Sequence, residues 1–523
     1  MERDNHVYLP LLNLPTFLSL ITLLLSILFL IGKRFSRKKS FNLPPSPPTL
    51  PIIGNLHLIG KHAVRSLTDL SQKYGPLMLL HMGSVRTVVV SSPDMVKEIT
   101  KNHDVVFSDR FNTTASDHLF YGGKDIVFAS YGNYWRQAKK FCVQEMLSSK
   151  RVLSFQSIRE EEVSSLVSKI RQDVCRNGDD GPVNICEMLI RTSNNIMSRC
   201  ILGRRYSCEE KQYQEEKGNK IMFCETAMKK IIVQLTAFSV GDFFPCFKWV
   251  DDVRGFMRNL KSSSGELDAF YNQVFKERKA MKASENGVKD FVDILLQLQK
   301  DNMFNMELTD EHLKPIVQDM FFGGIETTST TSEWVMAELM RNPRVMKKTQ
   351  EEVRRIMREK GRVDINELDK LDYFKCVVKE TLRLHPPVPL LVPRKTTEAV
   401  QIGGGQYTIP AGTQVIINAW AIHRDPNSWD QPEEFIPERF ENSPVNYYKG
   451  GQEYFQFIPF GFGRRRCPGI MFGTIGVEFM MANLLYWFDW KLHTDEDVDM
   501  SETYGITIGL KVPLFLLPIP YTP

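Results

Sequence analysis

A long stretch without charged side chains lies close to the N-terminus. Residues 5–32 contain no Asp, Glu, Lys or Arg, and residues 11–31, rich in Leu and Ile, are long enough to cross a bilayer. Basic residues crowd positions 33–39, and positive charge after a span favours keeping that side in the cytosol. The pattern predicts a membrane anchor over residues 1–32 with a lumenal N-terminus. A cleaved signal peptide is the alternative, but the apolar run is long for one and the basic cluster lies on the wrong side.

Apolar residues recur with helical period along most of the remaining chain. The segments that show this period are residues 158–175, 187–202, 265–283, 310–340, 343–360 and 373–385. Two regions have strand character instead. Residues 77–91 form two apolar, partly β-branched runs around Gly83 and Ser84, and residues 399–417 are interrupted by glycine and proline turns. We therefore expect helices over most of the chain and strands in these two regions.

Prolines separate the predicted anchor from the body of the chain. They crowd residues 44–51, and at this density they give a stiff extended spacer rather than a helix. The prediction is an anchor at residues 1–32, a basic stop-transfer and proline-rich hinge at residues 33–55, and a folded body at residues 56–523.

Composition narrows the possible partners and compartments. The chain has 523 residues and a net charge of only +4, which gives no reason to expect nucleic acid as a partner. Its nine cysteines include no Cys-x-x-Cys pair. An odd number without regular spacing argues against a disulfide framework or a zinc ribbon, and suits a reducing compartment.

One cysteine stands in a basic, glycine-punctuated loop. The sequence Phe-Gly-Phe-Gly-Arg-Arg-Arg-Cys-Pro-Gly, residues 460–469, precedes an apolar segment of helical period at residues 470–487. Three arginines and a helix start would keep the Cys467 thiol deprotonated, and Pro468 suits the first helical turn. A lone thiolate suits an axial ligand of haem iron better than zinc or an iron–sulfur cluster, which normally take several ligands from the chain. A buried, inert cysteine is the alternative.

The pattern Phe-x-x-Gly-x-Arg-x-Cys-x-Gly in this loop resembles the haem-binding loop of the cytochrome P-450 superfamily. It is filled by Phe460, Gly463, Arg465, Cys467 and Gly469. The resemblance implies the cytochrome P-450 fold, mainly α with a small β portion, and makes residues 56–523 the haem-thiolate catalytic domain. It also implies haem b as the cofactor, with Cys467 as its axial iron ligand and Arg465, Phe460 and Gly463 as further cofactor-binding residues.

A second motif lies inside the helix predicted at residues 310–340. Residues 320–331 contain adjacent glycines, which cost about 1 kcal/mol each in a helix interior, and threonines whose hydroxyls bond back to the preceding turn. We expect a local opening of the helix there. Gly323-Gly324-x-Glu326-Thr327 resembles the superfamily's oxygen-binding groove. This implies that Thr327 holds the dioxygen-derived ligand and that Glu326 helps to relay protons. A kinked packing helix is the alternative.

Glu380 and Arg383 lie three residues apart, on one face of a predicted helix. The spacing alone is a weak signal, since a surface ion pair gives the same pattern. With Arg439 in the downstream Pro-Glu-Arg-Phe sequence, the pair resembles the superfamily's Glu-Arg-Arg network. The implied role is structural, because breaking a buried triad leaves a lone buried charge.

The resemblance assigns further residues to the haem propionates. Trp135 and Lys139 occupy the Trp-x-x-x-Arg motif, and lysine in the arginine place keeps the charge but loses the bidentate fork. The other propionate partners implied by position are Arg110, Arg394 and Arg465. A basic patch on the thiolate side would suit docking of an acidic electron donor. It would consist of Lys139, Lys140, Arg464 and Arg466.

These resemblances predict a haem-thiolate monooxygenase of the plant microsomal type, anchored in the endoplasmic reticulum membrane with its catalytic domain in the cytosol. The expected partners are NADPH–cytochrome P-450 reductase, which passes on the electrons of NADPH, cytochrome b5 as a second donor, and a lipophilic small molecule. An alkaloid or terpenoid is the preferred substrate, and oxygen insertion, ring closure and desaturation stay open. The regions expected to line the pocket are residues 111–128, 221–247, 318–327, 388–392 and 504–508.

Two other function classes stay open. One is a haem-thiolate isomerase or dehydratase of lipid hydroperoxides, which needs no reductase. Such relatives lack the distal threonine and alter the cysteine loop, so Thr327 and the unbroken loop count against it. The other is a non-catalytic, membrane-anchored haem protein for binding or sensing, which the complete proton-relay pattern disfavours.

Overall fold

The computed structural model describes most of the chain after the proposed anchor. The described stretches are residues 42–177, 181–205, 230–280, 289–301, 308–445, 454–494 and 496–522. Of the predicted anchor, residues 15, 18, 19 and 21–26 are described, and they are helical and exposed. The remainder of the anchor and the basic segment at residues 33–41 lie outside the described residues.

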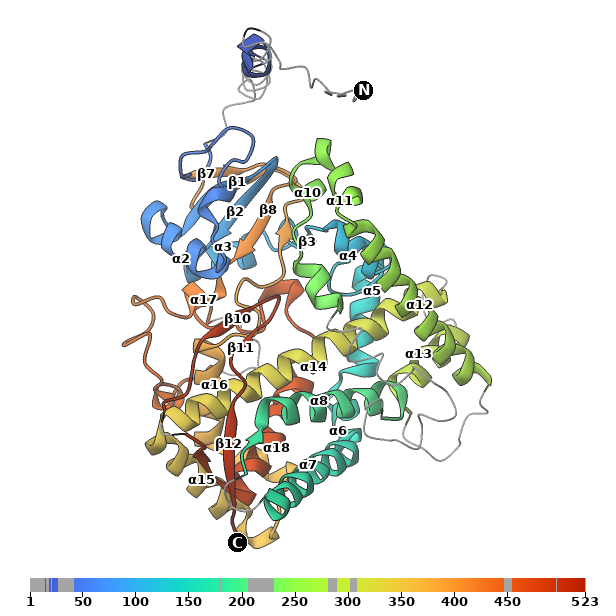
Figure 1. Ribbon diagram of the computed structural model, residues 1–523, viewed down its shortest axis with the longest axis vertical. Coiled ribbons are helices and arrows are strands. Elements are labelled where there is room, and N and C mark those ends of the chain that lie inside the picture. Colours follow the sequence, from blue (N-terminus) through green and yellow to red (C-terminus); the bar gives the residue numbers. More distant parts are fainter. Residues whose placement is uncertain are drawn as a thin grey trace, which may run out of the picture.

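The main sheet joins an N-terminal hairpin to strands from much later in the sequence. β1 (Leu77–Met82) pairs antiparallel with β2 (Val85–Val90), and β2 pairs parallel with β8 (Gln414–Ile417). The strand order is β1-β2-β8-β5-β3, with β5 at Arg394–Lys395 and β3 at Asp109–Arg110. Figure 1 shows β1, β2 and β8 side by side at one end of the molecule, while helices make up most of the rest.

The remaining strands form three small sheets. They are β4 (Val183–Asn184), β12 (Phe515–Pro520) and β9 (Phe488–Leu492); β6 (Val400–Ile402) and β7 (Tyr407–Ile409); and β10 (Glu502–Tyr504) and β11 (Ile508–Leu510).

A long central helix, α14 (Asp310–Arg341), runs through the helical part of the molecule (Figure 1). Its N-cap is Thr309, and it ends at Asn342 because a residue before proline disfavours the α conformation. The helices packed most extensively around it are α8 (Ile185–Leu202), α18 (Ile470–Trp487), α16 (Asp372–Leu384) and α15 (Pro343–Met357). α18 is apolar enough to cross a membrane, but 78% of it is buried, so it is a core helix.

The other helices complete the shell around this core. The α-helices are α2 (Ala63–Tyr74), α3 (Pro93–Asn102), α4 (Thr114–Leu119), α5 (Asn133–Phe141), α6 (Ser149–Ser154), α7 (Gln156–Asn177), α10 (Val240–Phe243), α11 (Trp249–Val253), α12 (Phe256–Ala280), α13 (Phe291–Lys300) and α17 (Ala419–Ile422). A π turn, η2, occupies Cys142–Met146. The 3₁₀ turns are η1 (Leu56–Leu58), η4 (Pro245–Phe247), η5 (Arg358–Lys360), η6 (Ile365–Lys370), η7 (Pro437–Phe440) and η8 (Gly463–Arg465).

The predicted helices and strands are confirmed where the structure describes them, with two differences at helix ends; residues 281–283 of the helix predicted at 265–283 lie outside the described residues. α12 begins at Phe256 rather than at residue 265, because the exposed Gly265 lies within the helix and does not start it. The helix predicted to reach residue 360 finishes as α15 at Met357 and continues as a 3₁₀ turn, η5. Tightening of this kind is common in the last turn of a helix.

Glycines allow α18 to lie close to α14. A Cβ atom at Gly476 would lie 3.4 Å from Thr328 Cγ2, and one at Gly473 would lie 3.9 Å from Thr328 Oγ1. A Cβ atom at Gly324 would lie 2.5 Å from the Cε of Met197 in α8. The crossing of α14 and α18 therefore places Thr328 beside the helix that follows the cysteine loop.

Replacing Gly476 by Leu should destabilise the fold by about 1–3 kcal/mol, because a large side chain would be forced into the contact with Thr328. Chemical denaturation of the purified protein measures this. Gly265→Leu is the matched control, since a Cβ at this exposed helical glycine meets nothing within 4 Å. Equal losses in both variants would mean that the close crossing is not needed.

Candidate haem-thiolate site

The cysteine loop turns on two glycines in the left-handed region. Gly461 has φ +70° and Gly463 has φ +61°, which glycine adopts at no steric cost. The Cys467 N–H donates to the carbonyl oxygen of Phe460 at 2.9 Å, which closes the loop. One expectation was wrong: α18 begins at Ile470 with Gly469 as its N-cap, so Pro468 lies before the first helical turn.

The thiol of Cys467 is accessible, although Phe462, Arg465 and Ile470 around it in sequence are buried. Protein nevertheless surrounds the sulfur closely enough for desolvation to raise its pKa above the ordinary value. The amide of Gly469 and the charges of Lys139 and Arg466 offset this in part.

Of the three loop arginines expected to keep the thiol deprotonated, only Arg466 offsets the raised pKa of Cys467, with Lys139 as a further cation. Arg465 instead donates to the carbonyl oxygens of Ser108 at 2.7 Å and Ile126 at 3.2 Å. Arg464 Nε lies 3.3 Å from Asp104 Oδ2. The expected source of positive charge was therefore only partly right, because two of the arginines are engaged by other elements.

Asp104 holds the loop from outside and was not identified from the sequence. Its Oδ2 accepts from the backbone N–H of Arg464 at 3.2 Å, in addition to the ion pair with the Arg464 side chain. A Cβ atom at Gly463 would collide with the Asp104 carboxylate. The Asp104 carboxylate is thus a second reason, besides the backbone angles, why position 463 needs glycine.

The glycine-threonine stretch of α14 forms an unbroken helix. The predicted local opening is wrong: α14 is helical throughout Asp310–Arg341. Hydroxyls bond back along it without breaking it, and Thr327 Oγ1 donates to the carbonyl oxygen of Gly323 at 2.6 Å. Gly323 is exposed although most of the helix is buried, and a Cβ there would meet nothing within 4 Å. Open space therefore adjoins Gly323.

Glu326 is anchored by a residue of the C-terminal hairpin. Thr507 Oγ1 donates to Glu326 Oε2 at 2.9 Å. The sequence placed residues 504–508 at the pocket by region, but gave no reason to single out Thr507. The contact fixes the carboxylate that resemblance assigns to proton relay.

The arginines assigned to the propionates gather in the interior. Arg110 and Arg394 face each other across β3 and β5, and both are buried, as is Arg465. Burial lowers the pKa of Arg394 and of Arg465 to about 10. Burial, with the charges of Arg465 and Arg394, also lowers the pKa of Arg110 well below its ordinary value. Arg394 Nη1 has no hydrogen-bond acceptor within the described stretches. Such a cluster favours an additional anion.

Trp135 and Lys139 lie on α5 beside this cluster. Trp135 Nε1 donates to the carbonyl oxygen of Ile126 at 3.0 Å, and the Arg465 guanidinium lies 4.2 Å from the centre of the indole ring. Lys139 donates to the carbonyl oxygens of Arg464 and Arg466, at 2.9 Å for the latter. Burial lowers the pKa of Lys139 to about 8. In this structure Lys139 therefore holds the cysteine loop directly.

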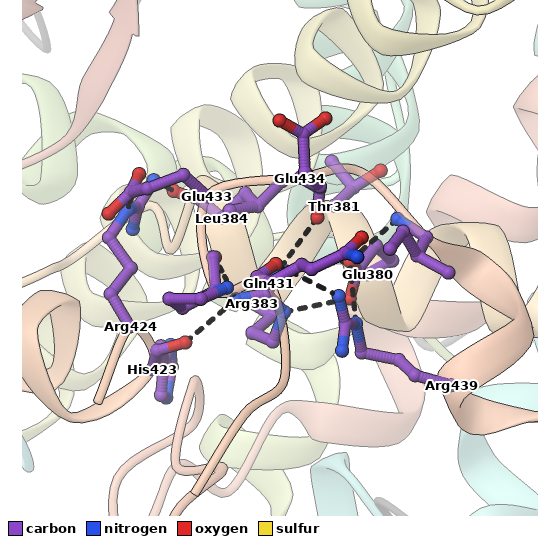
Figure 2. A network of polar contacts seen from close by, with 12 residues as sticks. Glu380, Thr381, Arg383, Leu384, His423, Arg424, Gln431, Glu433, Glu434 and Arg439 are labelled. Carbon is purple, nitrogen blue, oxygen red and sulfur yellow. Dashed lines mark hydrogen bonds and ion pairs between the residues drawn. The ribbon is translucent and has the colours of Figure 1, made fainter. Parts of the chain in front are cut away.

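The structure brings Glu380, Arg383 and Arg439 together (Figure 2). Arg383 donates to both Glu380 oxygens at 2.8 Å, and Arg439 Nε donates to Oε1 at 3.0 Å. The Glu380 and Arg383 side chains have no exposed surface. The guanidinium of Arg383 also donates to the carbonyl oxygens of His423, Pro432 and Glu434.

His423 connects this network to the cysteine loop and was not identified from the sequence. Burial, with the charges of Arg383 and Arg424, lowers the pKa of His423 to about 3. The neutral ring accepts a hydrogen bond at Nε2 from the backbone N–H of Ile458, at 2.9 Å. Ile458 in turn accepts from the N–H of Gly461. The ion-pair network is thus one step from the turn that carries Cys467.

Comparison with known proteins agrees with this arrangement. The sequence model of the family described as Cytochrome P450 matches residues 44–517. The chain belongs to the cytochrome P450 family. It is therefore a cytochrome P450 monooxygenase, with the mostly helical P450 fold and small sheets.

Plant P450s are similar to this chain over nearly its whole length. Phenylacetaldehyde oxime monooxygenase of Prunus mume is 49% identical over 93% of this chain and 91% of its own. Costunolide synthase of Cichorium intybus is 41% identical over 96% and 98%, respectively. A solved zebra fish cytochrome P450 with progesterone superposes with a TM-score of 0.73 at 25% identity, over 87% of this chain and 99% of that one.

P450 membership implies a haem cofactor, and the residues present fit it. Cys467 is exposed and could provide one ligand, and a Cβ at Gly323 in α14 would meet nothing within 4 Å. The buried guanidinium cluster suits the carboxylates that haem carries, since Arg394 Nη1 lacks a hydrogen-bond acceptor among the described residues and lies 4.0 Å from its one ion-pair partner there, Asp104 Oδ1. We expect Cys467 to hold the iron, and Arg110, Arg394 and Arg465 to hold the propionates.

Replacing Glu380 by Gln should destabilise the P450 by about 3–5 kcal/mol, because Arg383 would remain buried without its counter-charge. Denaturant unfolding of the haem-loaded protein measures the loss. Arg344→Gln is the control: it breaks an ion pair with Glu438 in which the arginine side chain is 72% exposed, so we expect little or no loss of stability. A similar loss in both variants would contradict a special role for the buried pair.

Proposed function

We propose that this P450 inserts one oxygen atom from dioxygen into a lipophilic plant specialised metabolite, or closes a ring or desaturates it, using electrons that a reductase takes from NADPH. An alkaloid or terpenoid is the preferred substrate. The observation that carries the proposal is the close crossing of α14 and α18, at which Thr328, the residue after Thr327, lies beside the helix that follows Cys467. Relatives named as an oxime monooxygenase, costunolide synthase and 5-epiaristolochene 1,3-dihydroxylase support a plant metabolite.

Bound haem would supply the iron at which dioxygen is reduced, and the thiolate ligand would favour cleavage of the O–O bond. The chain's own residues would supply protons. Thr327 Oγ1 donates to the carbonyl oxygen of Gly323, so its lone pairs can accept a hydrogen bond from a proton donor. Glu326 is held nearby by a hydrogen bond from Thr507. We infer that Glu326 passes protons toward the Thr327 hydroxyl.

The pocket regions that the sequence predicted are partly joined in space, and their side chains support an apolar substrate. The ring of Phe120 lies 4.9 Å from that of Phe128 and 6.1 Å from that of Phe322 in α14. A Cβ atom at Gly461 would lie 3.9 Å from Leu391 Cδ1, so that segment adjoins the cysteine loop. The Ile508 N–H donates to Pro387 O at 3.0 Å. Residues 221–229 of the predicted pocket lie outside the described residues.

An electron donor would dock on the thiolate side. Of the basic patch that the sequence predicted, Lys140 is exposed and the Arg464 side chain is 50% exposed, whereas Lys139 is engaged by loop carbonyls. Arg464 already pairs with Asp104, so we assign Lys140 the main part in attracting an acidic reductase, with cytochrome b5 as a second donor. The anchor would hold the enzyme on the cytosolic face of the endoplasmic reticulum.

Turnover in microsomes with a plant reductase and NADPH tests the proposal. A panel of terpenoids, alkaloids and phenolics is read by mass spectrometry, and we expect a gain of one oxygen or a loss of two hydrogens on one class. Cys467→Ser is the control and should give no product, because a hydroxyl does not replace the thiolate ligand. Product formed without NADPH from a lipid hydroperoxide would instead favour the isomerase or dehydratase. Binding without turnover would favour a non-catalytic haem protein.

Replacing Thr327 by Ala should lower product formation by about a hundredfold while NADPH oxidation continues and releases hydrogen peroxide, because the proton relay loses its hydroxyl. The ratio of product to NADPH consumed measures this coupling. Thr331→Ala is the matched control: Thr331 bonds back to Thr327 O at 2.7 Å one turn later in the same helix, and its loss should leave coupling unchanged. Unchanged coupling in Thr327→Ala would refute the relay.

A further inference from the structure

Two buried carboxyl groups lie within the pocket regions that the sequence predicted, although neither residue was singled out there. Asp125 lies in the connection between α4 and α5 and is fully buried, and Asp319 lies in α14 with 4% of its surface exposed. The two carboxyl groups lie close together, because Asp319 Oδ2 accepts from the backbone N–H of Ile126, the residue that follows Asp125. Asp319 precedes the Gly323–Thr327 groove by about one helical turn. The pair therefore fastens the α4–α5 connection to α14 next to the groove.

The remaining contacts of the pair leave one oxygen on each carboxyl. Asp319 Oδ2 accepts from the backbone N–H of Ile126 at 2.6 Å and of Val127 at 3.3 Å, and Asp125 Oδ2 accepts from the N–H of Phe128 at 2.8 Å. The Oδ1 atoms of both residues have no donor within the described stretches. Two buried carboxylates in contact would repel, whereas one proton between them satisfies both oxygens.

Charged and titratable groups surround the pair. Asp125 faces the guanidinium groups of Arg110 and Arg465, which favour its ionised form. Tyr134 and Cys142 face the pair from α5 and the η2 turn. Burial raises the pKa of Asp125 to about 6, and burial together with the charge of Asp125 raises the pKa of Asp319 well above the ordinary range. Asp319 is thus the member that keeps the proton.

The segment held by the pair carries the acceptors for the haem-side cations. We name residues 124–129 the anchor loop. Its carbonyl oxygens accept from Trp135 Nε1 and Arg465 Nη1 at Ile126, from Arg110 Nε at Val127, and from Arg465 Nη2 at Ala129. Tyr134 also donates to the Lys124 carbonyl oxygen. A shift of the anchor loop would move these acceptors together.

We propose that Asp125 and Asp319 share one proton, and that this carboxyl–carboxyl bond positions the anchor loop on α14 and thereby sets the guanidinium groups that face the haem propionates. The two residues are positioning residues and touch neither substrate nor iron. The bond is lost when the shared proton is released, so the anchor loop loosens as the pH rises. The variant Asp319→Asn keeps a neutral hydrogen-bond donor and acceptor, so the loosening of the anchor loop should no longer depend on pH.

Hydrogen–deuterium exchange of the full-length, haem-loaded enzyme tests the proposal, read by mass spectrometry on a peptide that covers residues 124–129. Protection is expressed relative to the intrinsic exchange rate at each pH. When the loop opens, the pKa of Asp319 returns to the ordinary carboxyl value of about 4. Protection of the wild type should therefore fall by up to about tenfold per pH unit as the pH rises above about 4, until the pH reaches the raised pKa of the pair. Asp319→Asn should show no such slope.

Two further variants make the result decisive. Asp319→Leu removes the bond at every pH, and should lose loop protection and the thiolate spectrum of the reduced carbon-monoxide complex, whereas Asp319→Asn should keep both. Asp125→Asn provides a second removal of the shared proton if Asp319→Asn fails to fold, and should also flatten the slope.

The matched control is Glu311→Gln, which breaks the exposed ion pair of Glu311 with Lys124, at 2.6 Å, between the same two elements. It should leave the slope of the wild type intact, since an exposed pair contributes little. A slope equal in the wild type and in both asparagine variants, or full protection in Asp319→Leu, would overturn the proposal. None of these readouts needs a substrate, so they are independent of the proposed function.

Discussion

The doubly hydrogen-bonded ion pair of Glu380 and Arg383 is the interaction on which the cysteine side of the protein depends. Neither side chain has exposed surface, so each charge must be matched in place. The N–H groups of Arg383 that Glu380 does not use are taken by carbonyls of residues 423–434, and this selects one path for the chain there. Through His423 and Ile458 the same choice reaches the turn before Cys467. The pair contributes a defined geometry more than net stability.

On the opposite side of the site, a buried carboxyl group is stabilised in a different way. Asp319 is also buried, but its carboxyl meets another carboxyl rather than a cation, and a proton takes the place of the counter-charge. Arg110, Arg394 and Arg465 lie between the two sides, and their N–H groups donate largely to backbone carbonyl oxygens. The site is thus built mainly by side chains that hold backbone, and only a few atoms are left for a cofactor or substrate.

The helices and the motifs were predictable because their signals are local. Hydrophobic period gave the helices around α14, and contiguous patterns gave Cys467, the Gly323–Thr327 groove and the Glu380 spacing. The errors arose where the role of a side chain depends on a partner far away in the sequence. The loop arginines were expected to serve the thiol, but Asp104 and the carbonyls of Ser108 and Ile126 engage two of them.

Several site contacts had no signal in the sequence at all. Asp104, His423 and Thr507 matter only because folding brings them to residues far away in the chain, and no local pattern marks them. The expected opening of α14 failed for a different reason: a hydroxyl that bonds to the preceding turn adds to the ladder without replacing one of its bonds.

The parallel pairing of β2 with β8 has a consequence for how the chain is made. Val88 pairs with Val415 and Val90 with Ile417, so the hairpin that emerges early from the ribosome must wait for most of the chain before its inner edge is covered. An open edge of β-branched residues is a template for wrong pairing. Closing so long a loop is also slow. Productive synthesis should therefore depend on protection of this nascent hairpin, and changes that slow elongation between β2 and β8 would lower the yield of folded enzyme without altering its finished structure.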